Sequence, residues 1–590
     1  MSEKISIILI VLLFVAGSTF ADGLMRPDDE NYPKDLLGNR CTKIWVKIHG
    51  QIAETIVYQE FVNEWHRPTG AVYNFPLAPD ARATNLFYWY HDTCFQAVLK
   101  VKEQAVNPGT GEGGIAAELN KYLGRNGIKM HIKEIQPGAI QKVKLHFISL
   151  CKYYNGELTY EYPLETQQFV TYPLDLLSVD IDLHTNSDIE SFGIPGFSDW
   201  QATVDEPQHV NIRLDESKTY LSKNLIFKYK VPVDETKVDF YSVANDSMDG
   251  HFVLTVNPDE TVEDAGVMSE RIVFVLNNTS NMFGYRFDQA KEAIAQCLDM
   301  MSEADYFDIM VFNYNVSSWQ GQLVAATPEN ISAAKNYLNS VSTGWGSDVE
   351  SALKQALTRF PDAAVCNSII LFSNGYSPVD PAEIARENTH KAGIFSVGYG
   401  EDLDRAKLEM ISLLNYGFVT YFDENDNLKA GIARLYEQIS RPIMIDTNYE
   451  FGAADIYGLQ PRTFPALFQG SRFFMTGRYK NPGMSAVSVA GTSTDGITAL
   501  DYRLPFSSET DQYKFAERIW AKETIDDIER QIAVYGENDS LKNLDIAISL
   551  QYNIRCKYTA FIADYENEAT TVRSLEPEIA QPVTSYIVGN

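Results

Sequence analysis

The spacing of hydrophobic positions changes along the chain and separates a β-rich beginning from the later regions. In residues 44–48, β-branched residues alternate with residues of the opposite face, and alternation returns in residues 143–147 after a Pro-Gly turn signal. A period of two is typical of strands with one buried face. We therefore expect a β-rich region over residues 38–165, interrupted by one helix-like stretch at residues 114–123.

The next region stays strand-rich but has no sharper signature. We expect residues 166–265 to form a strand-rich connecting region. Its apolar, β-branched runs are residues 177–183, 225–231 and 251–256. Runs of this length and composition are typical of strands.

In the centre, over residues 268–442, the pattern alternates between two periods. Short apolar runs, of the kind buried in a parallel sheet, are followed by segments whose apolar residues fall on one helical face. The expected strands are residues 271–276, 307–312, 368–372 and 394–397. The expected helices are residues 287–298, 329–338, 349–357, 381–392 and 428–439. Such alternation predicts βαβ units, and hence a doubly wound α/β domain built on a parallel sheet.

After residue 442 the chain is expected to be β-rich again. We predict a β-rich C-terminal region over residues 443–566 with one helix near 515–532, followed by further β structure. Residues 567–590 are expected to form a polar tail. The fold class is therefore a multidomain arrangement, α/β in the centre and all-β on both sides.

Composition and charge exclude two classes of partner. The chain has 590 residues, of which 45% are hydrophobic and 22% charged, as in ordinary globular proteins. It carries 49 Lys and Arg against 79 Asp and Glu, a formal charge of −30. Phosphate binding needs clustered cationic side chains, so we expect neither nucleic acid nor anionic lipid as a partner.

The first residues predict export. Lys4 precedes an apolar run over residues 5–17, and small residues before Asp22 suit a signal-peptide cleavage site, which gives a signal peptide over residues 1–21. Glu3 leaves an uncleaved anchor as the alternative. No later stretch is long and apolar enough to cross a bilayer, so no transmembrane segment is expected. The mature protein is expected to be secreted, periplasmic or held at the cell surface.

Cysteine and histidine give no metal signature in the sequence. Six cysteines permit 15 disulfide pairings, and none lies in a CxxC motif. The nine histidines show no metal-ligand or catalytic spacing, and we interpret them as scattered strand residues.

The β-rich beginning resembles the VIT domain, a module of vault proteins and inter-alpha-trypsin proteins. Several separated motifs occur in the family's order over residues 38–165. They are His49-Gly50-Gln51-Ile52-Ala53-Glu54-Thr55, Phe61-Val62-Asn63, Tyr73-Asn74-Phe75-Pro76-Leu77, Ile135-Gln136-Pro137-Gly138 and the strand at 143–150.

The centre resembles a von Willebrand factor A-type domain. Asp305-Tyr306-Phe307-Asp308-Ile309-Met310-Val311-Phe312 matches that family's second strand, and Phe395-Ser396-Val397-Gly398-Tyr399-Gly400 matches its fifth. Four further motifs occur in order after this domain. They are Phe464-Pro465-Ala466-Leu467-Phe468-Gln469-Gly470, Thr476-Gly477-Arg478-Tyr479, Arg518-Ile519-Trp520-Ala521 and Tyr558-Thr559-Ala560-Phe561. The whole succession resembles inter-alpha-trypsin inhibitor heavy chains and their bacterial relatives.

The A-type resemblance implies a cation site, the ion-dependent adhesion site, in three loops after the strands. The family pattern is Asp-x-Ser-x-Ser in the first loop, Thr in the second and Asp in the third. The matching positions are Asn277, Thr279 and Asn281 in the first loop, Ser347 in the second and Asn374 in the third.

Both of the pattern's aspartates are replaced by amides, which supply no countercharge to a hard dication. We therefore expect a degenerate adhesion site without a metal or other cofactor. Mg²⁺ or Ca²⁺ held with the help of Asp348 is the alternative.

These features favour an exported binding or adhesion protein that is not an enzyme. Its partner would be a protein ligand or a component of the extracellular matrix, contacted by the A-type and VIT domains. A structural, matrix-organising scaffold is the alternative, since the heavy-chain resemblance implies it. An enzyme is the third reading, although the sequence contains no GxSxG, HExxH, P-loop or dinucleotide-binding fingerprint.

Overall fold

The computed structural model describes residues 22–564 with internal gaps. The gaps are residues 34–35, 79, 91, 103–122, 124–125, 155, 168, 233–235, 246–247, 259–265, 281–284, 362–364, 400–402, 423–426 and 509–511. The predicted signal peptide, the polar tail and nearly all of the helix-like stretch at 114–123 lie outside the described residues.

The N-terminal half forms a β-sandwich. One layer is an eight-stranded sheet, in the spatial order β14 (Trp200–Glu206), β15 (His209–Thr219), β12 (Leu174–His184), β2 (Gly38–His49), β3 (Ile52–Val62), β9 (Ile140–Leu150), β5 (Arg82–Tyr90) and β6 (Thr93–Gln96). Its other layer comprises two smaller sheets: β1 (Leu24–Pro27), β4 (Thr69–Phe75) and β8 (Ile128–Ile135), then β10 (Lys152–Tyr154), β11 (Glu157–Tyr162), β16 (Leu225–Lys230) and β13 (Ser191–Gly193).

Alternation within the strands explains this sandwich. In β2 the side chains of Ile44, Val46 and Ile48 are buried, whereas the intervening residues face the opposite side. They join one apolar core with Phe75 and Phe227 from the smaller sheets. Strands from both the predicted VIT region and the connecting region therefore share a single core.

The central domain is a seven-stranded, mostly parallel sheet. Its strands, in order, are β21 (Val316–Ser318), β20 (Tyr306–Phe312), β19 (Glu270–Asn277), β23 (Cys366–Phe372), β24 (Gly393–Tyr399) and β25 (Val419–Phe422), with β22 (Val324–Ala325) paired to β20. Helices α2 (Tyr285–Met300), α3 (Pro328–Ser340) and α7 (Leu428–Ile439) pack on one face. Helices α4 (Val349–Leu357), α5 (Pro381–Glu387) and α6 (Arg405–Leu413) cover the other. The predicted doubly wound sheet is confirmed.

This domain differs from the prediction in the end of one helix and in elements that were not predicted. Helix α5 ends at Glu387 rather than at residue 392, because the Asn388 side chain bonds the backbone of Ala392 in both directions at 2.8 Å. An Asn amide that pairs with the chain in this way competes with helical hydrogen bonding. Helix α6 and strand β25 were not predicted.

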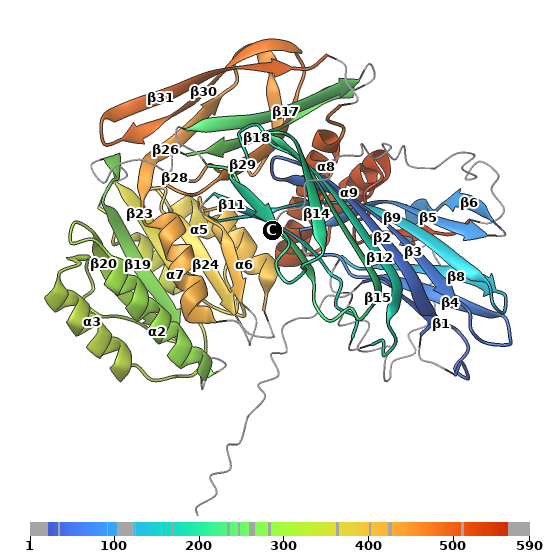
Figure 1. Ribbon diagram of the computed structural model, residues 1–590. Coiled ribbons are helices and arrows are strands. Elements are labelled where there is room, and N and C mark those ends of the chain that lie inside the picture. The colour runs from blue at the N-terminus through green and yellow to red at the C-terminus, as the bar shows by residue number, and fades with distance from the viewer. Residues whose placement is uncertain are drawn as a thin grey trace, which may run out of the picture.

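A second sandwich lies above the central domain (Figure 1). One sheet contains β17 (Lys237–Asn245), β18 (Met248–Asn257), β29 (Phe473–Tyr479) and β27 (Ile456–Gln460); the other contains β28 (Leu467–Phe468), β26 (Pro442–Glu450), β30 (Gly483–Ser493) and β31 (Gly496–Phe506). Strands β18 and β29 pair antiparallel although the whole central domain separates them in sequence. The central domain is therefore an insertion between two strands of this sandwich.

Two long helices come next, α8 (Phe515–Tyr535) and α9 (Asp539–Tyr552), and then β32 (Thr559–Ile562), which pairs with β7 (Val98–Val101). The sequence predicted β structure after residue 532, and the helix α9 corrects that prediction. Apolar residues alternate near residue 548 as in a strand, but Leu544 and Leu550 are exposed while Ile548 and Tyr552 are buried. The buried spacing is that of a helix, and the Asn538 side chain caps it by accepting the Leu541 N–H at 2.9 Å.

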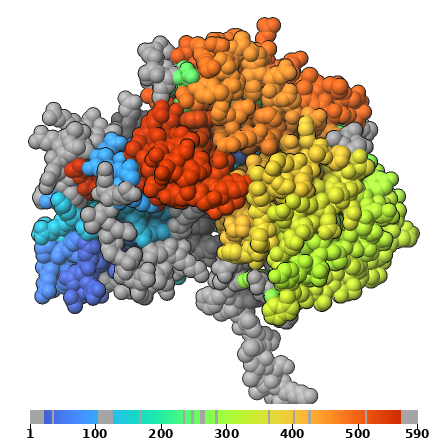
Figure 2. Space-filling view, turned by 180° about the vertical axis from the view of Figure 1, so that it is seen from behind, coloured from blue at the N-terminus to red at the C-terminus, as the bar shows by residue number. Residues whose placement is uncertain are grey.

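Helix α8 joins the parts of the molecule. From behind, the C-terminal helices lie between the N-terminal sandwich and the central domain (Figure 2). Arg518 of α8 lies 3.5 Å from Glu54 of β3, and Arg530 lies 3.7 Å from Glu409 of α6. One helix therefore contacts two domains.

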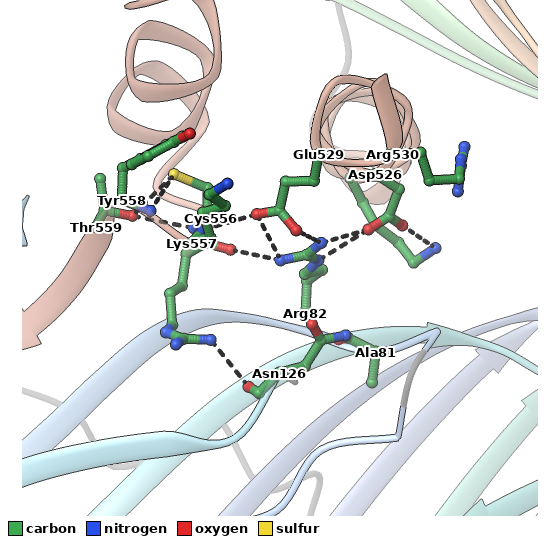
Figure 3. A network of polar contacts seen from close by, with 12 residues as sticks. Ala81, Arg82, Asn126, Asp526, Glu529, Arg530, Cys556, Lys557, Tyr558 and Thr559 are labelled. Carbon is green, nitrogen blue, oxygen red and sulfur yellow. Dashed lines mark hydrogen bonds and ion pairs between the residues drawn. The ribbon is translucent and has the colours of Figure 1, made fainter. Parts of the chain in front are cut away.

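A further connection is a buried ion network around Arg82 of β5, whose side chain is only 4% exposed (Figure 3). Its guanidinium donates to Glu529 Oε2 at 2.8 Å and to Asp526 Oδ1 at 3.1 Å, both on α8. Lys522 Nζ lies 3.1 Å from Asp526 Oδ2 and completes the network. Because each charge is paired, the network tolerates burial that would otherwise be costly.

Asp545 of α9 lies in this buried region and makes stability depend on pH. Burial, together with the negative charge of Glu529, raises the pKa of Asp545 from 3.8 to about 7. Between these two values the folded protein holds a proton that the unfolded chain has released, so stability falls as pH rises through that window. We expect Asp545→Asn to raise the free energy of unfolding at pH 8 by up to about 4 kcal/mol, at about 1.4 kcal/mol per pKa unit.

Denaturant unfolding across pH tests this expectation. The exposed Asp501→Asn, on β31, is the matched control and should leave the pH profile unchanged. A profile for Asp545→Asn that still declines between pH 4 and 7 as in the native protein would contradict the assignment.

The six cysteines are unpaired, and all but Cys94 are buried. Burial raises the pKa of Cys41 to about 11 and that of Cys151 to about 12. Thiols of this kind stay protonated at neutral pH and behave as small apolar groups.

Candidate functional site

Three loops meet at the carboxyl edge of the central sheet. The chain goes from β19 outward to β20 and then returns to β23 on the other side of β19. Reversal of strand order opens a crevice between the loops after β19 and β23, and ligands of open α/β sheets bind at such points. The loop between α3 and α4 lies beside them, because Thr279 and Gly344 form a parallel bridge.

The first loop begins with a buried asparagine. Asn277 is 1% exposed, and its Oδ1 accepts the N–H of Thr279 at 2.9 Å. The amide Nδ2 has no hydrogen-bond partner among the described residues. The group of Asn277 that remains without a partner is therefore an N–H donor, at the position where the A-type pattern has a carboxylate. Asn281 lies outside the described residues.

The second loop supplies Ser347 and Asp348. Asp348 caps α4, its side chain accepting the Ser351 N–H at 3.0 Å, and its own N–H donates to the Asn313 carbonyl at 2.9 Å. One carboxylate oxygen is thus committed to the helix N-terminus. The Ser347 hydroxyl is buried and has no partner within the described part of the chain.

The third loop contains Asn374 and is tied to the second. Asn374 Oδ1 accepts the N–H of Tyr376 at 3.2 Å. The Ser377 hydroxyl donates to the Ser347 carbonyl and accepts the N–H of Val349, each at 3.1 Å. The structure therefore brings Asn277, Thr279, Ser347, Asp348 and Asn374 together on linked loops.

These side chains do not fit a hard dication. The set contains two amides, two hydroxyls and one carboxylate already used as a helix cap, whereas Mg²⁺ and Ca²⁺ favour oxygen ligands with carboxylate countercharge. The unpaired atom of Asn277 is an N–H donor, which repels a cation and suits an acceptor. A cation of the protein itself lies nearby, since Lys407 Nζ is 3.2 Å from the Ser377 carbonyl.

Aromatic side chains project from the second and third loops and from the turn between β20 and β21. Tyr314 is 76% exposed, Trp345 81% and Tyr376 53%. The Tyr314 N–H donates to the Trp345 carbonyl at 3.1 Å, which joins two of these segments. Gly346 has a φ of +76°, and a Cβ there would collide with the Tyr314 ring. We call Tyr314, Trp345 and Tyr376 the aromatic rim.

The sequence motifs predicted the polar loop positions but not this rim. A signal was present, because Trp345 lies between two glycines and Tyr376 comes directly after Gly375, each beside a predicted site residue. Large apolar residues in glycine-rich loops after strands lack a core to join, so exposure was the natural expectation.

Comparison with known proteins identifies the class of the two principal domains. The family model described as von Willebrand factor type A domain matches residues 270–420. The family model described as Vault protein inter-alpha-trypsin domain matches residues 40–147. The chain therefore contains a VIT domain and, after it, an A-type domain, in agreement with the resemblances that its motifs indicated.

Curated relatives match over most of the chain. Human inter-alpha-trypsin inhibitor heavy chain H4 is 23% identical over 585 residues, which cover 90% of this chain and 61% of that protein. Human heavy chain H3 is 23% identical over 645 residues, covering 98% of this chain and 70% of that protein. The chain thus spans about three-fifths of the length of the H4 relative.

Among solved structures, a von Willebrand factor type A protein from Catenulispora acidiphila matches with a TM-score of 0.41 and 13% identity. That match covers 55% of this chain and 94% of the other.

Proposed function

We propose that this protein is an exported adhesion protein whose A-type loops bind a protein ligand without a divalent cation. Its VIT and A-type domains and its heavy-chain relatives support a protein-binding, adhesion-type function. Beyond this general function, we propose that the ligand is a protein, that it contacts the A-type loops and that its binding needs no metal. We assign no catalytic role to the loops.

The aromatic rim is the observation that carries the proposal. Tyr and Trp are enriched among the residues that dominate protein–protein binding energy, because they bury large area at a small cost in side-chain entropy. Tyr314, Trp345 and Tyr376 are exposed on segments linked to a polar centre, whose Asn277 Nδ2 and Ser347 hydroxyl lack partners within the described chain. A ligand that inserts an acceptor group toward this centre while covering the rings would complete an interface with an apolar border and a polar anchor.

Metal independence is a consequence of charge. With Asn277 and Asn374 in place of the two aspartates of the A-type pattern, the centre lacks the countercharge that repays dehydration of Mg²⁺ or Ca²⁺. Its unpartnered N–H and O–H groups suit an acceptor rather than a cation, so no bridging cation is required.

Export is proposed from the apolar N-terminal run and the relationship to heavy chains. Among the residues that the structure describes, no helix has the length and apolar character needed to cross a membrane.

Affinity capture from the protein's own extracellular medium tests the proposed function. We expect a discrete partner to be retained in EDTA and to be lost, by at least about tenfold, when Trp345 and Tyr376 are both replaced by alanine. The matched control is Ile497→Ala on β31, which removes an apolar side chain that is 92% exposed elsewhere.

Three results would contradict the proposal. They are capture that EDTA abolishes, capture unaffected by the double alanine variant, and capture lost equally in the Ile497→Ala control. Recovery of a polymeric assembly in place of a discrete partner would favour the matrix-organising alternative.

A further inference from the structure

Three adjacent strands of the eight-stranded sheet each place a histidine at the same level. His49 ends β2, His184 ends β12 and His209 begins β15, and the register pairs His184 with both of the others. These strands lie side by side in Figure 1. The ring centroids of His49 and His184 are 5.1 Å apart, and those of His184 and His209 are 4.0 Å apart.

A carboxylate lies against two of these rings. Asp182 is two residues before His184 and therefore shares its face of the strand. Its Oδ1 lies 2.9 Å from His184 Nε2 and 2.8 Å from His209 Nε2. The three ligand-type atoms lie within 4.8 Å of one another. Two imidazole nitrogens and one carboxylate oxygen thus converge on one point, as they do in three-ligand metal centres.

The surroundings of His209 match those of a metal ligand. Its second ring nitrogen, Nδ1, faces Asp205 Oδ2 at 3.6 Å, and Asn211 Nδ2 donates to the same oxygen at 2.6 Å. Metal-ligating histidines commonly present their other nitrogen to a carboxylate, which fixes the tautomer and orients the ring. With the proton on Nδ1, His209 directs that proton to Asp205. Its Nε2 then has a lone pair for an ion, which would replace the longer contact of 3.3 Å with Asn211 Nδ2.

The position of His184 is also fixed. His49 stacks on the ring face of His184 opposite His209, and is itself stacked on Phe515 at 5.3 Å. Phe515 begins α8 and is buried. Packing of this kind limits rotation of the His184 ring, so the two ligating nitrogens are held in place before an ion arrives.

We propose that Asp182, His184 and His209 form a binding site for a divalent transition-metal ion of the Zn²⁺ class. Imidazole with one carboxylate suits Zn²⁺ and its neighbours, whereas Ca²⁺ and Mg²⁺ favour all-oxygen sets. The side chains of His184 and His209 are 34% and 26% exposed, so the ion is reachable from solvent. Three protein ligands leave a fourth position for water.

The described chain has one other cluster of potential ligands, which is less suited to an ion than the histidine site. It comprises Glu529, Asp545 and Cys556. All three are buried, and Arg82 already neutralises Glu529. The histidine site lies in the N-terminal sandwich, away from the A-type loops, so its test is independent of the proposed function.

Zn²⁺ titration of the full mature chain, in a large excess of Ca²⁺, tests the proposal. The Ca²⁺ occupies generic acidic sites on a chain of formal charge −30 and does not compete for imidazole. We expect a single equivalent of Zn²⁺ to bind saturably, measured by competition with a chromophoric chelator. Asp205→Asn should weaken binding about tenfold, and His184→Ala or His209→Ala by more than that.

The matched control is His131→Ala, which removes a surface histidine that contacts a single carboxylate, Asp28 Oδ2, at 2.7 Å. It should leave Zn²⁺ affinity unchanged. X-ray absorption on the loaded native protein needs no variant and should show two imidazole nitrogens at about 2.0 Å. Absence of saturable binding by the native protein, an all-oxygen absorption spectrum, or native affinity in the His184→Ala/His209→Ala double variant would overturn the assignment.

Discussion

Replacing Arg82 with methionine is expected to lower the free energy that holds α8 against the N-terminal sandwich by about 3–5 kcal/mol. The change leaves Glu529 buried and Asp526 largely buried, with side chains 3% and 13% exposed, and removes the guanidinium that pairs with both. An uncompensated buried charge costs far more than the pair itself contributes, because neither water nor a counterion replaces the lost partner. Lys522 still pairs with Asp526, so most of the lost stability comes from the unpaired charge of Glu529.

Hydrogen exchange of backbone amides in α8 and β5 measures this effect, because it reports opening of a segment without requiring the whole chain to unfold in one step. The matched control is Arg213→Met, which removes an arginine that is 57% exposed and pairs with Asp180 and Asp215. Exposed pairs contribute about 0–1 kcal/mol, so the control should barely change exchange. Equal effects of the two variants would show that the Arg82 network does not join α8 to the sandwich.

Local pattern was sufficient for most of the central domain. Helices α4 and α7 have the bounds that hydrophobic spacing predicted, and the structure adds the reason that they start where they do. Asp348 and Asn427 each cap the first turn with a side-chain oxygen. Short runs such as β19, buried along nearly its full length, were identified because continuous apolar runs are typical of parallel strands covered on both faces.

Pairing between strands that are distant in the sequence could not be predicted from local hydrophobic spacing. The pairing of β18 with β29 makes the central domain an insertion, and no local spacing contains that information. The same limit explains the histidines. His49, His184 and His209 are far apart in sequence, and only the cross-strand register aligns them on one row. The interpretation of the histidines as scattered strand residues was correct about their strands and missed their convergence.

For the candidate site in the A-type loops, the sequence predicted the residues but not the geometry of their side chains. The loop positions came from a family pattern that names the residues, so Asn277, Ser347 and Asn374 were identified before their geometry was known. The direction of the Asn277 amide was not predictable, because it depends on which N–H group its Oδ1 accepts from, here that of Thr279. That choice leaves a donor rather than an acceptor at the centre, and it strengthens the expectation of a cation-free site.

Converting both asparagines to aspartate should create a cation response that the native protein lacks. In Asn277→Asp/Asn374→Asp, two buried carboxylates repel one another and the protein loses stability in the absence of metal. Mg²⁺ or Ca²⁺ at about 100 times its dissociation constant should then restore about 2.7 kcal/mol.

Thermal unfolding with and without the ion measures this difference. The native protein and Asn543→Asp, an exposed change on α9, should show no saturable shift, which separates a built site from weak attraction to an acidic surface. Asp348→Ala supplies the opposing test. Loss of this helix cap should cost about 0.5–2 kcal/mol equally with and without the ion. A strong, saturable response in the native protein that disappears in Asp348→Ala would contradict the cation-free assignment, because it would mean that Asp348 supplies the charge that Asn277 and Asn374 do not.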